Sequence, residues 1–240
     1  MRIPHRRRSV LRQLGCQAFI SFLALVSLHA QVIRDGTIGP AGGPLTGPNF
    51  QIPSNLGLRK GDNLFHSFQK FDLQIGDSAT FNAEGARNIL ARVTDRNPSS
   101  INGAINADAN LFLMNPAGIV FGQNATVNVT GSFFATTADY IKLGVSGKFA
   151  ATTQAHDSIL TVSDPSAFGF LTPNPAAIRV NGSQLAGPKT LGLIGGDVSV
   201  DNGALLQAVE VTNNIRPPIP VPNYTKLNHS CRFPISFEPT

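Results

Sequence analysis

The sequence has little cysteine, little charge and no tryptophan. Its two cysteines are Cys16, in the N-terminal segment described next, and Cys231 near the other end. A chain left with one cysteine forms no internal disulfide and offers no cysteine cluster to a metal ion. We therefore expect packing and backbone hydrogen bonds to hold the fold together.

Long apolar runs are also scarce. The run Leu14–Leu28 spans roughly fifteen residues, which is short for a membrane-spanning helix of about twenty. Ala30 is a small residue at which cleavage would leave Gln31 first, and a basic region precedes the run: Arg2, Arg6, Arg7, Arg8 and Arg12. This pattern predicts a secretory signal peptide over residues 1–30, with an uncleaved N-terminal anchor as the alternative. We expect the general secretion machinery to export the chain, with no integral membrane segment after signal removal.

Removal of residues 1–30 would remove the excess of basic charge. The chain has 19 Lys and Arg against 14 Asp and Glu, a formal net charge of +5. Five arginines lie in residues 1–30, which leaves 14 basic residues against 14 acidic ones. Nucleic-acid-binding proteins carry a basic patch, and no cluster of Lys or Arg remains here. The mature chain is therefore predicted not to bind nucleic acid.

From residue 31 to about residue 208, short apolar runs of strand length alternate with Gly, Asn, Pro and Asp. Many short strands indicate a sandwich, a barrel or a β-solenoid. Small aliphatic residues, Asn and Gly at the corners and few hairpin signals favour the solenoid over the sandwich, although no strict repeat is visible. We expect rungs of the solenoid at Ala125–Val129, Ser158–Val162, Ala177–Gln184 and Asp197–Leu206.

Three other segments differ from this pattern. Ile89, Leu90 and Val93 have helical spacing, so Glu84–Val93 is the one candidate helix. Residues 31–63 are rich in Gly and Pro and suit an N-terminal cap over the open end of a solenoid. Residues 209–240 are predicted to be an extended or disordered tail, since they contain Pro217, Pro218, Pro220, Pro222, Pro234 and Pro239.

One turn is defined especially well by its sequence. Asn115, Pro116, Ala117 and Gly118 lie between the apolar runs 111–114 and 119–121. Asn at the first position accepts a local hydrogen bond, Pro at the second fixes φ, and Gly at the fourth relieves strain, as in a type I turn. On residue chemistry alone this turn is structural.

Together with Ile119, the turn resembles the Asn-Pro-Asn-Gly-Ile signature of filamentous-haemagglutinin-type two-partner-secretion domains, the haemagglutination activity domain family. Ala117 stands where the second Asn would be. Further blocks resemble the same family in the same order, over roughly residues 31–208: Gln31–Thr37, Gly61–Phe71, Ile89–Gly103, Gly131–Asp139 and Lys189–Val198.

The resemblance implies an all-β, right-handed parallel β-helix with an N-terminal cap and extra edge strands. It divides the chain into a signal peptide (1–30), a two-partner-secretion domain (31–208) and a Pro-rich tail (209–240). The implied function is secretion targeting. The periplasmic domains of a cognate outer-membrane transporter barrel would bind the unfolded chain, which would then fold at the cell surface or in the medium of a Gram-negative-type cell.

The transporter-recognition residues implied by the resemblance are Asn115, Pro116, Ala117, Gly118 and Ile119. A second family motif, Asn-Pro-Asn-Leu, would fall near residues 81–85, where only Asn82 matches. Proteins of this family usually continue far beyond the domain, so we expect this chain to be a truncated or frameshifted gene product, or a fragment.

An enzyme is the less favoured interpretation. The acidic residues are scattered singly, whereas glycosidases need a carboxylate pair at a defined separation. His66 and His156 are expected to be structural, and Ser67 gains no base merely by following His66. We therefore predict no catalytic residue, cofactor or metal site. The alternative functions are a stand-alone surface adhesin or carbohydrate-binding module, using exposed Asn and Thr, or a truncated remnant.

Overall fold

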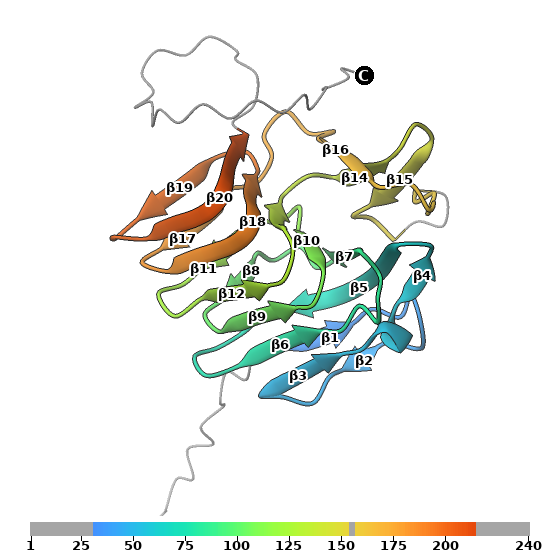
Figure 1. Ribbon diagram of the computed structural model, residues 1–240, viewed down its shortest axis with the longest axis horizontal. Coiled ribbons are helices and arrows are strands. Elements are labelled where there is room, and N and C mark those ends of the chain that lie inside the picture. Colours follow the sequence, from blue (N-terminus) through green and yellow to red (C-terminus); the bar gives the residue numbers. More distant parts are fainter. Residues whose placement is uncertain (1–30, 154–156, 215–240) are drawn as a thin grey trace, which may run out of the picture.

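The computed structural model describes residues 31–153 and 157–214, with the side chains of the last strand up to residue 208. The predicted signal peptide and residues 215–240 lie outside this part. The regular secondary structure of the described residues is β-strand, apart from one 3-10 helix, η1 (Ser54–Leu56) (Figure 1). No helix within them has the length and hydropathy that a membrane span requires.

The strands form a three-sided coil of parallel sheets, which we call faces A, B and C. The chain passes from face B to face A, then to face C, and back to face B one level further along the coil (Figure 1). Face A contains β5 (Asn63–Phe71), β7 (Asn88–Val93), β10 (Asn110–Met114), β13 (Phe133–Thr136), β18 (Gln184–Ile194) and β20 (Leu205–Asn214). Face B contains β3 (Asn49–Ile52), β6 (Ser78–Phe81), β9 (Ala104–Ala107) and β12 (Thr126–Val129). Face C contains β8 (Ser99–Ile101), β11 (Ile119–Phe121), β17 (Ile178–Asn181) and β19 (Val198–Asp201). The predicted all-β parallel solenoid is confirmed.

The turns of the coil are regular in space but not in sequence. Leu64, Ile89, Leu111 and Phe133 pair in register down face A at spacings of 25, 22 and 22 residues. The next step, from Phe133 to Leu191, takes 58 residues, because a separate small sheet is inserted there. Unequal turn lengths explain why the sequence shows no strict repeat.

The interior of the coil is filled by the inward side chains of the three faces. The five residues of the face A row are fully buried, as are Phe81 on face B and Phe121 on face C. Fully burying a large apolar side chain stabilises a fold by about 1.5–3 kcal/mol. This continuous core is therefore the main source of stability in a chain that we expect to lack disulfides.

The N-terminal end of face A is covered, as predicted for a cap. β1 (Val32–Arg34) and β4 (Leu58–Lys60) both pair antiparallel with the edge of β5 that faces away from β7, and β2 (Gly43–Pro44) pairs with β1. These pairings satisfy backbone groups on an edge that would otherwise be open to another chain.

A side sheet packs against the outer surface of face A. It consists of β14 (Tyr140–Leu143), β15 (Gly147–Ala150) and β16 (Pro165–Gly169), which pair antiparallel. Its inward residues, including Ile141, Phe149 and Phe168, form a second apolar cluster with the outward residues Phe65 and Phe112 of face A. Face A is therefore buried on both sides.

Two sequence-based predictions of local structure are wrong. Residues 84–93 form no helix, because β7 occupies Asn88–Val93 and is buried along its whole length between the core and the side sheet. Burial on both sides makes both alternating positions apolar, which imitates helical spacing. Ser158–Val162 forms no rung of the coil; in this segment Ile159 makes a single antiparallel bridge to Lys148 of the side sheet.

The C-terminal end of the described fold extends beyond the boundary expected at residue 208. β20 continues to Asn214, and its residues 210–214 pair in parallel with residues 190–194 of β18. The second half of this strand thus belongs to face A.

His66 is a buried ionisable residue in the first turn of the coil. It is 1% exposed, and its ring packs against Phe68 and Phe81 of the core. No group of the described residues forms a hydrogen bond with its Nε2. Burial lowers the pKa of His66 to about 4.

This burial predicts a loss of stability in acid. The unfolded chain binds a proton at His66 below the ordinary histidine pKa of 6.5, whereas the folded protein resists protonation down to about pH 4. Stability present above pH 6.5 is therefore lost as the pH falls towards 4, by on the order of 3 kcal/mol. We expect His66→Leu to flatten this part of the pH profile in urea unfolding. Parallel profiles for the two proteins would contradict the prediction.

The position of β20 predicts that a stop after Ala208 is more harmful than a stop after Asn214. The shorter chain leaves residues 190–194 without their strand partners, and each lost backbone hydrogen bond costs about 1 kcal/mol. Thermal unfolding followed by circular dichroism should show a lower midpoint for the shorter chain. Equal midpoints would show that the second half of β20 contributes nothing.

Candidate functional site

The predicted recognition turn lies at the corner where the chain passes from β10 on face A to β11 on face C. Asn115, Gly118 and Ile119 are buried, and Pro116 and Ala117 are half-buried. The expected turn is present, since the amide of Gly118 donates to the carbonyl of Asn115 over 3.0 Å. The motif is therefore built into the wall of the coil.

The side chain of Asn115 bonds entirely inside the protein. Its Oδ1 accepts a hydrogen bond from the amide of Ala117 at 2.9 Å. Its Nδ2 donates to the carbonyl of Asn97 at 3.2 Å and to Oγ of Ser99 at 3.0 Å. With 0% of its surface exposed, Asn115 joins this corner to the previous turn of the coil and presents nothing to solvent.

Gly118 is required by both backbone conformation and space. Its φ of +121° lies in a region that residues with a Cβ rarely adopt. A Cβ there would stand 3.3 Å from the carbonyl oxygen of Ala177 and 3.4 Å from Pro98, which lie on the two neighbouring turns. The glycine of the signature therefore allows successive corners of the coil to stack closely.

The weaker motif residue, Asn82, lies at a different corner, between β6 on face B and β7 on face A. Its Oδ1 accepts from the amide of Glu84 at 2.9 Å, the same two-residue reach that Asn115 uses. Unlike Asn115, it is exposed. The structure does not bring the two motifs together, because the width of face A separates their corners.

The candidate catalytic residues do not assemble. Ser67 follows His66 on β5 and therefore points to the opposite face of the strand; its Oγ donates to Asp35 at 2.6 Å and accepts from Arg92. The hydrogen bonds of Ser67 and Thr37 and the charge of Arg92 outweigh the effect of burial and lower the pKa of Asp35. The residues described contain no group of three His, Cys, Asp or Glu that could hold a metal ion. His156 lies outside the described residues.

Arg92 forms a buried junction that was not predicted from the sequence. It is 3% exposed, and its guanidinium donates to the carbonyls of Ala150 and Thr152 at 2.7 Å each and to Oγ1 of Thr37 at 2.9 Å. It also lies 5.3 Å from the ring centroid of Phe149. The signal for such a site was a single charge within the apolar run 89–93, because a buried charge needs partners.

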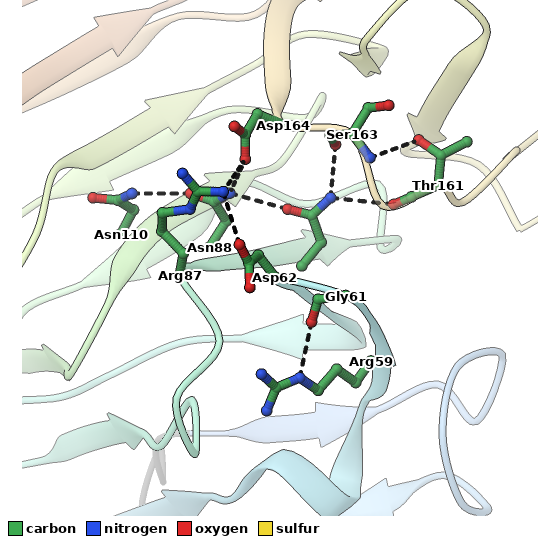
Figure 2. Close-up of polar contacts among 10 residues, drawn as sticks. Arg59, Gly61, Asp62, Arg87, Asn88, Asn110, Thr161, Ser163 and Asp164 are labelled. Carbon is green, nitrogen blue, oxygen red and sulfur yellow. Dashed lines mark hydrogen bonds and ion pairs between the residues drawn. The ribbon is translucent and has the colours of Figure 1, made fainter.

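A row of asparagines forms a second junction, at the corner before face A (Figure 2). Asn110 donates to Asn88 at 2.9 Å, and Asn88 donates to Asn63 at 3.0 Å, one residue from each of three successive turns. The last amide in the row, Nδ2 of Asn63, donates to the carbonyls of Thr161 and Ser163 in the segment before β16. Asp164 accepts from Asn88 at 3.0 Å and lies 3.4 Å from Arg87.

The described residues thus form a parallel β-solenoid in which the polar motif residues serve as corners. The sequence comparison identifies the family: residues 30–229 match the model of the TPS secretion domain, the secretion-targeting domain of two-partner-secretion exoproteins. The chain belongs to this family. Members of the family are exported by a partner transporter in the outer membrane of Gram-negative cells.

A curated relative is the heme/hemopexin-binding protein of Haemophilus influenzae, which is 33% identical over 81 residues. The match covers 33% of this chain and 9% of that protein. The chain thus matches only a small part of its relative, in keeping with a shared secretion domain.

The burial of Asn115 predicts a structural role that can be measured. Asn115→Ala removes three hydrogen bonds from a buried corner and should lower the free energy of unfolding by about 2–3 kcal/mol. Asn82→Ala is the matched control, since it removes one bond at an exposed corner and should cost less than about 1 kcal/mol. Urea unfolding of both variants provides the comparison, and equal costs would contradict the assignment.

Proposed function

We propose that the cognate outer-membrane transporter recognises this chain before it folds, through the turn Asn115–Ile119. Residues 1–30 direct the chain to the general secretion machinery, and periplasmic domains of the transporter bind the unfolded chain there. The chain then crosses the pore and folds on the outside, at the cell surface or in the medium.

The complete burial of Asn115 is the observation that carries this proposal. Every polar atom of its side chain is used inside the fold, so a transporter has access to it only in the unfolded chain. The turn itself is local, because Pro116 fixes φ and the bonds to Ala117 and Gly118 span two and three residues. It can therefore form without the rest of the coil. The bonds to Asn97 and Ser99 need the coil, and in the unfolded chain Nδ2 is available to a partner.

The physical character of the chain suits this route. A chain with one cysteine after signal removal forms no intramolecular disulfide in the oxidising periplasm. Each turn of the solenoid contacts mainly its neighbours, so folding can propagate from one end as the chain emerges.

Recognition, and not catalysis or sugar binding, is the function we propose for residues 31–214. His66 is enclosed by aromatic rings, and Ser67 bonds to Asp35 and Arg92 instead of to His66. Asparagines on the surface bond to one another between turns, as Asn106 does with Asn128 and Asn102 with Asn124. These contacts give the surface asparagines a structural role in joining successive turns of the coil. Heme and hemopexin binding belongs to the name of the relative, and we do not propose it for this chain.

The proposal is tested by co-expression with the cognate transporter, scoring protein in the medium. Asn115→Ala should reduce export at least tenfold, since it removes the side chain on which recognition depends. A matched control is Val127→Ala, which removes apolar volume from a buried position on β12 at a cost of about 1–3 kcal/mol. Equal loss of export in both variants would attribute the defect to stability, and undiminished export of Asn115→Ala would remove the turn from recognition.

A further inference from the structure

The side sheet arises at the corner directly beside the recognition turn. β10 pairs with β13, and β11 pairs with β17, so the link from β13 to β17 replaces the turn that would stack on Asn115–Ile119. That link carries β14, β15 and β16. The ends of the inserted segment are therefore the neighbours of the recognition turn on its C-terminal side.

The two ends form backbone hydrogen bonds with the recognition turn. The amide of Asn115 donates to the carbonyl of Thr136 at 2.9 Å, and the amide of Ile119 donates to the carbonyl of Ala177 at 3.3 Å. The two ends are joined to each other, because Oγ1 of Thr137 donates to the carbonyl of Ala176 at 2.8 Å. Until these residues are in place, the turn is bonded only to the preceding turn of the coil.

The body of the side sheet is fastened to turns that precede it in the chain. Arg92 donates to the carbonyls of Ala150 and Thr152. Asn63 donates to the carbonyls of Thr161 and Ser163, two residues that Figure 2 labels. Between these junctions, Phe149 packs edge to face on Phe65, with ring centroids 5.2 Å apart. One inserted segment thus contacts the first turns of the coil and also closes the recognition turn.

We propose that docking of the side sheet is the step that closes the Asn115–Ile119 turn and ends its availability to the transporter. Thr136 ends β13 and reaches the turn when β13 pairs with β10, whereas Ala177 follows β16 and reaches the turn when β14, β15 and β16 dock on face A. The transporter is then released as a consequence of folding. The part of this inference that concerns release rests on the proposed function, whereas the coupling between docking and closure is a property of the protein alone.

Native-state hydrogen exchange measures the coupling without any partner. Phe149→Ala weakens docking from the side-sheet side and leaves the turn unaltered. We expect it to lower the protection of the Ile119 amide about tenfold or more, together with that of Ala151 directly after β15, and to change the Asn115 amide less because β13 supplies its acceptor. The amide of Ala104, which donates to Asp77 on another corner, serves as the internal control and should change far less.

A milder variant covers the case in which Phe149→Ala does not fold. Asp164→Ala removes the contacts to Asn88 and Arg87 at the surface and should produce a smaller change in the same amides. If Ala151 loses protection in either variant while Ile119 keeps its protection, docking and closure are independent and the inference is wrong.

A second measurement separates the inference from the proposed function. Full-length protein is diluted from urea into a solution of the transporter's periplasmic domains, and the period of binding competence is timed. Phe149→Ala should prolong this period several-fold over wild type, and Val127→Ala should not. Absence of binding by unfolded wild type would refute the proposed function and leave the exchange result standing. Binding with equal periods for wild type and Phe149→Ala would refute the release step.

Discussion

The parallel pairing of face A, buried on both sides, is the constraint on which the rest of the structure depends. Its inner surface supplies the row from Leu64 to Leu191 in the core, and its outer surface packs under the side sheet. A sheet that is covered on both sides must satisfy its backbone groups by pairing between strands. This requirement accounts for the cap strands β1 and β4, which pair along β5. Burying a polar group without a partner is costly, which accounts for the bonds of Arg92 and Asn88, whereas Nε2 of His66 is buried without one among the described residues.

The same constraint explains what the sequence could and could not predict. Strand-length runs and corner residues were sufficient for an all-β solenoid, and the Asn115–Gly118 turn could be read position by position because its bonds are local. The prediction of a helix at residues 84–93 was wrong because β7 is buried on both sides. A strand of this kind lacks the alternation of polar and apolar residues that identifies a strand in a sequence. The side sheet could not be foreseen, because its position depends on contacts between residues more than fifty positions apart, as from Arg92 to Ala150.

The recognition residues illustrate a limit of a different kind. Sequence resemblance selected Asn115 and Asn82 by residue type, but only the structure separates a buried corner from an exposed one. Both asparagines make the same local bond to the second amide along the chain. They differ in the hydrogen-bond partners that the neighbouring turns of the coil provide. Those partners depend on how the turns stack, and no pattern in the nearby sequence indicates them.

Burial of a recognition motif imposes an order on events. A motif that stays exposed can be bound at any stage, whereas one that supplies corner bonds to the fold can be bound only while those bonds are unmade. The folded protein offers Asn115 the carbonyl of Asn97 and the hydroxyl of Ser99 within its own chain. Any partner must compete with these intramolecular acceptors, whose effective concentration rises as the coil forms. Folding therefore displaces the partner, and the same side chain can serve recognition first and stability afterwards.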